Sequence, residues 1–265
     1  DGIVLAMVSE VLRLSCEERE ALAAFACRTV NGRGSVVISV GAESTPLAVR
    51  FARHAEAHGA DAIMAIPPVS IALGDDELLA YYSRLLDATS LPLIVQDASG
   101  YVGRPMPIAL QARILDEFGP ERVLYKPEAT PIGPKLSELR DGTGGRARIF
   151  EGTGGTALVD SHRRGIVGTM PGADLVRGIV ALWRSLEAGD HARADAIHAP
   201  ISAIVALASS LDGFLAIEKH LLVRQGIFSN TLVRGPVGFR LDDETRDEAS
   251  RQFDRLLQLL KESAD

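Results

Sequence analysis

The sequence predicts an α/β fold, a parallel (β/α)8 TIM barrel that continues into a C-terminal helical extension. Three observations predict it. Short apolar runs alternate with amphipathic helical segments, the runs are apolar almost throughout, and they start 19 to 33 residues apart. Strands covered on both faces have this continuous apolar character, and the spacing accommodates a strand, a crossover helix and two loops. Seven such units in a row favour a barrel over an open sheet.

The predicted strands are short and rich in β-branched residues. In chain order they are GIVLA from Gly2, SVVISVG from Ser35, AIMAIPP from Ala62, PLIVQD from Pro92, RVLYKPEA from Arg122, ARIFEG from Ala147 and IVGTMPG from Ile166. A barrel of this type has eight strands, and the chain begins directly in a strand. We therefore expect that the first barrel strand is missing from this chain and that the seven runs are strands two to eight.

Amphipathic helices are predicted between the strands, and helices alone after the last strand. Ser15 and Glu18 have the spacing of a capping box at the start of the first helix. The helices after the last strand are expected at roughly 174–187, 191–209, 213–225 and 243–262. We therefore expect the barrel over residues 1–188 and a helical extension packed on it over 189–265.

Composition and charge exclude several classes of partner. The net charge is −7 and the basic residues are scattered, which argues against nucleic acid and anionic membrane surfaces as partners. No apolar run approaches the ~18 residues of a membrane span, and the first residues lack the basic segment of a signal peptide. Cys16 and Cys27 form neither a disulfide framework nor a metal site at their spacing. These features predict a cytoplasmic protein.

Lys126 is the most informative residue of the sequence. It is one of only four lysines and lies in the apolar run RVLYKPEA, near the end of a predicted buried strand. Active sites of such barrels lie at the carboxyl ends of the strands. Burial disfavours the charged form of an amine, and a neutral amine condenses with ketones. The residues alone leave two interpretations open, a Schiff-base nucleophile and a lysine that is only salt-bridged to Glu128 or Asp97.

Other polar residues stand at comparable strand ends. Alternation along a strand puts Lys126 and Glu128 on one face, about 7 Å apart, as a nucleophile with its acid/base group or as a simple ion pair. Gln96 ends its own strand, where its amide can orient a hydroxyl or a carboxylate but transfers protons poorly. Asp97 then points toward the helices or lies on the loop, where a hydrogen bond within the loop is its simplest role.

Two glycine-rich loops follow the last two strands, GTGG from Gly152 and GTMPG from Gly168. In many barrels this corner binds phosphate through backbone N–H groups, which makes Gly152 and Thr169 candidate substrate contacts. Glycines at these positions also serve tight turns. The histidines follow neither a zinc signature nor a Ser–His–Asp order, so the sequence predicts no metal site.

Four stretches together resemble one enzyme family. They are AMVSEVLRLSCEER from Ala6, HAEAHGADAIMAIPP from His54, YKPEA from Tyr125 and GIVGTMPG from Gly165. In combination they are similar to the dihydrodipicolinate synthase / N-acetylneuraminate lyase family of class I, Schiff-base aldolases and dehydratases. The resemblance covers essentially the whole chain, from the family's second strand onward. It implies that Lys126 forms a Schiff base with a 2-keto acid.

The sequence departs from the family pattern at several positions. Met7 and Val8 replace two threonines that commonly hold the keto-acid carboxylate, so the resemblance leaves that carboxylate to backbone N–H groups and to Ser9. Gln96, followed by Asp97, replaces a proton-relaying tyrosine, and Tyr101 replaces an arginine of the synthase. These changes argue against the synthase of lysine biosynthesis. The QD pair, KPEATP and the Ala6-to-Glu10 turn instead resemble the 2-keto-3-deoxy-L-arabonate dehydratase branch.

The resemblance therefore implies a lyase that dehydrates a 2-keto-3-deoxy sugar acid. Lys126 would form the Schiff base, Glu128 would remove a C3 proton, and Glu128 or a water held by Gln96 would protonate the leaving hydroxyl. A retro-aldolase that releases pyruvate, a synthase-like condensation and a sugar-acid-binding protein without activity stay open. The chemistry needs no cofactor, because the lysine supplies the electrophilic activation. The resemblance also implies a homo-oligomer, a dimer or a tetramer.

Overall fold

The computed structural model describes residues 1–208 and 210–261. The chain packs as two compact units, the first made of residues 1–150 and 166–168 and the second of residues 151–165 and 169–265. Ser209 and Glu262, where two of the predicted helices were expected to end, lie outside the described residues.

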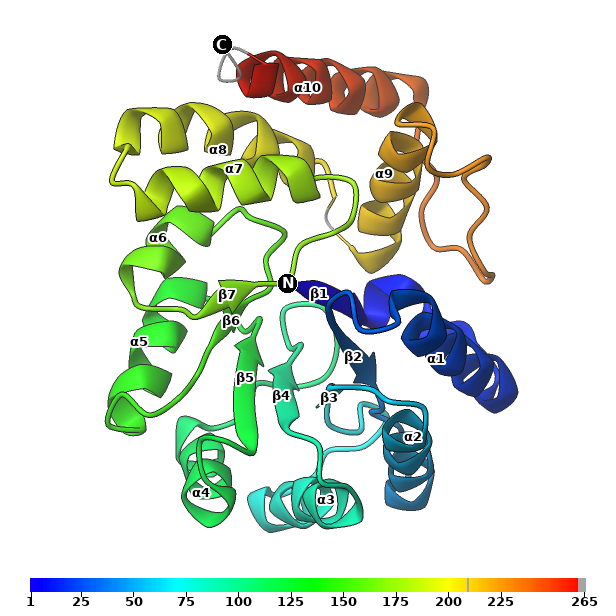
Figure 1. Cartoon of the computed structure of the whole chain (residues 1–265), viewed down its shortest axis with the longest axis vertical. Coiled ribbons are helices and arrows are strands. Elements are labelled where there is room, and N and C mark those ends of the chain that lie inside the picture. The colour runs from blue at the N-terminus through cyan, green and yellow to red at the C-terminus, as the bar shows by residue number, and fades with distance from the viewer. Residues whose placement is uncertain (209, 262–265) are drawn as a thin grey trace. The chain divides into compact units, whose positions relative to one another are not determined.

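A parallel five-stranded sheet is the core of the first unit (Figure 1). Its strands lie side by side in chain order, as β1 (Gly2–Leu5), β2 (Ser35–Ser39), β3 (Ala62–Ala65), β4 (Leu93–Asp97) and β5 (Val123–Pro127). An isolated parallel bridge between Tyr125 and Ile149 continues this order beyond β5. Every residue of β3, β4 and β5 is buried, as predicted for strands that are covered on both faces.

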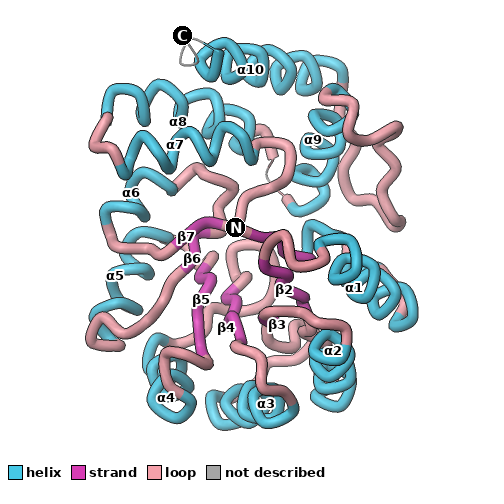
Figure 2. The backbone as a smooth tube through the Cα atoms, in the orientation of Figure 1, coloured by secondary structure: helices cyan, strands magenta, loops and turns pink. Residues whose placement is uncertain are grey.

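Helices alternate with these strands and cover the sheet (Figure 2). They are α1 (Cys16–Val30), α2 (Thr45–Ala57), α3 (Asp75–Ala88), α4 (Ile108–Phe118) and α5 (Ile132–Gly142), with the 3-10 turns η1 (Met7–Ser9) and η2 (Val11–Arg13) after β1. The predicted capping box is confirmed. Ser15 Oγ accepts from the Glu18 N–H at 3.2 Å, and the Glu18 carboxylate accepts from the Ser15 N–H at 2.9 Å.

Helices dominate the second unit. They are α6 (Leu158–Arg163), α7 (Val176–Glu187), α8 (His191–Ala206), α9 (Leu211–Arg224) and α10 (Asp243–Lys261). Helix α8 packs against α7, and α10 packs against both α8 and α9. The predicted boundary between residues 188 and 189 falls between α7 and α8 and stays a prediction. Among the described helices, none combines the length and the apolar character that a membrane crossing requires.

The last two predicted strands are much shorter than their apolar runs suggested. β6 (Phe150–Glu151) and β7 (Gly168–Thr169) pair as a two-stranded sheet of two residues each. Both strands lead directly into glycine-containing loops, and glycine weakens a strand because it loses more backbone freedom on folding and offers no side chain to pack. The boundary between the two units passes through these strands.

A buried pair of carboxyl groups holds the loop after β7 in the second unit. Asp174 lies in this loop and Glu218 on α9, and both side chains are buried. Glu218 accepts a hydrogen bond from the Ala173 N–H at 3.0 Å. Burial, and then the nearby Glu218 carboxylate, raise the pKa of Asp174 to about 7. The folded protein therefore keeps a proton on Asp174 under conditions in which an exposed aspartate is ionised.

This raised pKa predicts how stability changes with pH. The unfolded chain loses the Asp174 proton near the ordinary value of 3.8, whereas the folded chain holds it to about pH 7. Because the folded state binds more protons in this window, the free energy of unfolding falls as pH rises from about 4 to 7, by at most ~1.4 kcal/mol per pH unit. Asp174→Asn should remove this part of the fall, since an amide does not titrate.

Urea unfolding between pH 4 and 8 measures the effect. Asp76→Asn is the control, because its side chain is 91% exposed and should leave the pH profile unchanged. Equal slopes for the unmodified protein and Asp174→Asn would show that Asp174 does not hold its proton in the folded state.

Candidate active site

Lys126 lies in β5 and is only 5% exposed. Its register partner on β4 is Gln96, so the two side chains point to the same side of the sheet. Lys126 Nζ lies 2.9 Å from Glu128 Oε1. The structure thus places the predicted nucleophile in a buried ion pair with the predicted acid/base group.

Glu128 connects Lys126 to Gln96. This carboxylate is 5% exposed and follows the last residue of β5. Its second oxygen, Oε2, accepts a hydrogen bond from Gln96 Nε2 at 2.5 Å, and Gln96 itself is 1% exposed. Both oxygens of the carboxylate therefore have a partner, the ammonium on one side and the amide on the other. We call Lys126, Glu128 and Gln96 the lysine cluster.

Backbone hydrogen bonds hold Glu128 in place. Its N–H donates to Asp97 O at 2.7 Å, and its carbonyl accepts from the Gly100 N–H at 3.1 Å. A side chain at position 100 would not fit, because an added Cβ would lie 2.4 Å from Glu128 O. The last residue of β4 and the loop that follows it therefore each hold the backbone of the proposed acid/base group at one point.

Asp97 holds this loop from the opposite face of β4. Its side chain is buried, and its two oxygens accept from the Ser99 N–H at 3.1 Å and the Met106 N–H at 2.9 Å. This is the loop hydrogen bonding that the sequence also allowed. Both carboxylate oxygens thus already accept a hydrogen bond from the loop. Contact between Asp97 and a substrate stays a prediction.

The expected carboxylate-binding residues lie after β1. Met7, Val8 and Ser9 form η1, in which the Ser9 N–H donates to Ala6 O at 2.9 Å and the Met7 side chain is buried. The first N–H groups of a helical turn have no acceptor within the turn, which is compatible with binding a carboxylate. The roles of these three residues stay predictions.

Gly152 and Thr169 belong to the second unit, where a buried glutamate organises their surroundings. Glu151, for which the sequence suggested no role, accepts hydrogen bonds from the Thr169 hydroxyl at 2.7 Å, from the Thr153 N–H at 2.5 Å and from the Thr153 hydroxyl. The Thr169 hydroxyl thus already donates its hydrogen bond to Glu151. A threonine two residues after a strand-ending glutamate was the only local signal, and such pairs are common in ordinary turns. Substrate contact through Gly152 and Thr169 stays a prediction.

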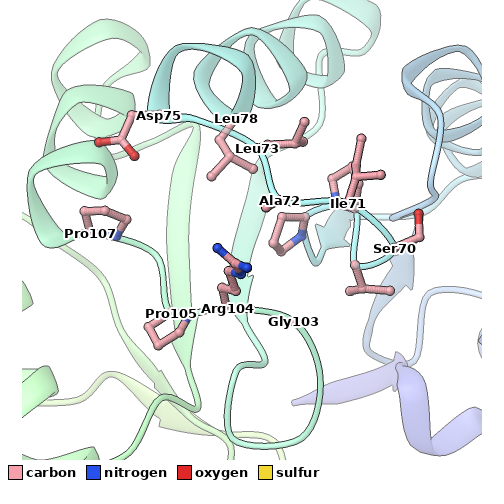
Figure 3. A pocket seen from close by; sticks show the side chains of 13 residues that line it. Ser70, Ile71, Ala72, Leu73, Asp75, Leu78, Gly103, Arg104, Pro105 and Pro107 are labelled. Atoms are coloured by element: carbon pink, nitrogen blue, oxygen red, sulfur yellow. The ribbon is translucent and has the colours of Figure 1, made fainter.

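A surface cavity lies beyond the ends of β3 and β4 in the first unit (Figure 3). Its volume is about 450 Å³, and it is lined by segments 67–73 and 103–105, together with Asp75, Leu78 and Pro107. The Arg104 side chain lies between these two segments. None of the lining residues is part of the lysine cluster, so this cavity does not identify the reacting centre.

Comparisons with known proteins show which family the chain is similar to. Residues 1–256 match the dihydrodipicolinate synthetase family. The chain is 28% identical over 269 residues to an L-2-keto-3-deoxyarabonate dehydratase of Azospirillum brasilense, which covers 97% of this chain and 84% of that protein. It is also 36% identical over 107 residues to a probable 2-dehydro-3-deoxy-D-pentonate aldolase of Escherichia coli, a match to 40% of this chain and 36% of that protein.

The structure is also similar to that of a solved 4-hydroxy-tetrahydrodipicolinate synthase. A 4-hydroxy-tetrahydrodipicolinate synthase of Methylacidiphilum fumariolicum superposes with a TM-score of 0.87 at 22% identity, over 99% of this chain and 86% of that one. Such a likeness establishes the fold, and it confirms the predicted (β/α)8 barrel class. The family match over residues 1–256 shows that this chain belongs to the dihydrodipicolinate synthetase family.

Proposed function

We propose that this protein is a Schiff-base-forming lyase that dehydrates a 2-keto-3-deoxy sugar acid. The observation that carries the proposal is the buried lysine cluster at the ends of β4 and β5, with Lys126 Nζ 2.9 Å from Glu128 Oε1. The likeness to an L-2-keto-3-deoxyarabonate dehydratase over 97% of this chain supports this substrate class. A homo-oligomer and a cytoplasmic location stay predictions.

The ion pair explains how a buried lysine becomes a nucleophile. Glu128 accepts a proton from the Lys126 ammonium across the ion pair, which leaves a neutral amine. The amine attacks the C2 carbonyl of the keto acid, and the resulting carbinolamine loses water. The proton on Glu128 goes to the departing oxygen, so the protonated imine forms with no net change in protons.

The protonated imine then draws electrons from C3. Glu128, ionised again, removes a C3 proton and leaves an enamine, whose electron pair forms the C3–C4 double bond while the C4–O bond breaks. Glu128 returns its proton to the departing hydroxyl, which leaves as water. The unsaturated iminium tautomerises, and hydrolysis releases the keto product and the free Lys126 amine. The lysine supplies the electron sink, so the proposal requires neither a metal nor an organic cofactor.

The first prediction from this proposed mechanism concerns the covalent step, formation of the imine on Lys126. Borohydride reduction in the presence of pyruvate should leave one stable adduct per chain, on Lys126, because borohydride reduces an imine to an amine that no longer hydrolyses. Intact-mass measurement and peptide mapping locate it. Lys135 is the internal control, since it has the same kind of partner, Glu138 at 2.7 Å, but its side chain on α5 is 33% exposed. Absence of any adduct would remove the catalytic role of Lys126 and leave a sugar-acid-binding protein.

The second prediction concerns the proton transfers. Glu128→Gln should lower kcat by about 10² to 10⁴, because an amide cannot carry the C3 proton, while some imine trapping on Lys126 persists. Turnover and borohydride trapping are measured on the same preparation. Glu138→Gln is the matched control, because it removes the carboxylate that pairs with Lys135 on α5. Full activity of Glu128→Gln would refute the role assigned to Glu128.

The third prediction concerns the products. A dehydration converts a 2-keto-3-deoxy pentonate into a dehydrated keto acid with the same number of carbons, whereas a retro-aldol reaction yields pyruvate and an aldehyde. The similarity to a pentonate aldolase makes the second reaction the competing candidate. We expect the five-carbon product by mass spectrometry of the reaction mixture. Pyruvate and a two-carbon aldehyde in equal amounts would establish the aldolase instead.

A further inference from the structure

The Glu128 carboxylate fixes the direction of the Gln96 amide. An ionised carboxylate only accepts hydrogen bonds, so the group that faces it must be the NH2 of the amide. Gln96 Nε2 accordingly lies 2.5 Å from Glu128 Oε2. The amide oxygen, Oε1, must therefore point away from the carboxylate.

This oxygen has no hydrogen-bond partner among the described residues. Gln96 is 1% exposed, so Oε1 is a buried acceptor that the residues from 1 to 208 and from 210 to 261 leave unsatisfied. Other described side chains also have such atoms, for instance Gln252 on α10. Gln96 differs because its amide donates to the carboxylate that pairs with Lys126. In addition, Ser99 Oγ, just after the same strand, is buried and has no partner in the part of the chain that the structure describes.

We propose that Gln96 Oε1 accepts a hydrogen bond from the C4 hydroxyl of the bound substrate and thereby selects keto acids that carry this hydroxyl. The proposal rests on the Schiff-base function proposed above. In the proposed imine, C2 is bonded to Lys126 Nζ and C3 faces Glu128. The next carbon, C4, therefore extends past Glu128. The group held on the far side of Glu128 is the amide of Gln96.

The chemistry of the amide also bears on which bond breaks. A neutral amide accepts a hydrogen bond but does not take the proton, so the C4 hydroxyl keeps its proton while Gln96 holds it. Elimination needs this retained proton and a second one from Glu128, so that water leaves. Retro-aldol cleavage of the C3–C4 bond instead needs the hydroxyl proton removed. Gln96 at this position therefore favours loss of water over loss of pyruvate.

The test compares two keto acids that differ only in this hydroxyl, 2-oxobutanoate and 4-hydroxy-2-oxobutanoate. For each, borohydride trapping is measured against concentration to obtain half-saturation, and intact mass identifies the adduct. The unmodified protein should prefer the hydroxylated acid about tenfold, the effect of one satisfied buried acceptor. Gln96→Met should lose this preference. The ratio is taken within each variant, so general effects on imine formation cancel.

The matched control is Gln111→Met. Gln111 is also a buried glutamine of the first unit, and its Nε2 donates to Met106 O at 3.2 Å. It lies on α4, where its backbone carbonyl accepts from the hydroxyl of Tyr125, a β5 residue whose side chain points away from that of Lys126. Its substitution should leave the preference intact. If Gln96→Met does not fold, Gln96→Asn, which withdraws the amide by one carbon, should show the same loss.

The outcomes separate the two proposals. An unchanged preference in the Gln96 variants would overturn the role of Oε1 and leave the Schiff-base function standing. If the unmodified protein trapped both acids equally well, the role of Oε1 would likewise be overturned and the Schiff-base function would stand. Failure of the unmodified protein to trap either acid would overturn the Schiff-base function and this inference together.

Discussion

The carboxylate of Glu128 is held between an ammonium and an amide, away from water. Removing an ionised carboxylate from water costs several kcal/mol unless charged and hydrogen-bonding partners replace the lost hydration. Lys126 supplies the opposite charge to one oxygen, and Gln96 supplies a hydrogen bond to the other. Each member of the lysine cluster is thus tolerable in the interior only because the others are present. In the proposed reaction, the contact between Lys126 and Glu128 is also the one across which a proton moves.

Residues on both faces of β4 contribute to this arrangement at the end of the strand. Successive side chains of a strand point in opposite directions, so Gln96 reaches the carboxylate while Asp97 reaches the other way and ties down the following loop. Asp97 O, at the end of β4, accepts from the Glu128 N–H, and the Gly100 N–H of the loop donates to the Glu128 carbonyl. Gln96 therefore contacts the carboxylate of the proposed acid/base group, while Asp97 fixes the loop next to it. Together these contacts hold Glu128 in a single position.

Sequence patterns predicted the features that depend on nearby residues. The capping box of α1 and the shared face of Lys126 and Glu128 follow from spacings of three and two residues, which local geometry decides. The contact between Gln96 and Glu128 depends on the register of β4 against β5 and on side-chain rotamers, which no local pattern contains. Asp174 and Glu151 gave little local signal for a similar reason. Their properties come from burial and from neighbours that are distant in sequence, such as Glu218 and Thr169.

The close approach of Gly100 to Glu128 O bears on efforts to evolve new substrate preferences in this enzyme. The β4–α4 loop invites diversification, since Tyr101, Gly103, Arg104 and Pro105 are exposed. Position 100 is different, because any side chain would collide with the carbonyl of the proposed acid/base residue. A library that randomised the whole loop would therefore lose most of its members to one shared steric fault. Keeping glycine there while varying the exposed positions would preserve the backbone that holds Glu128.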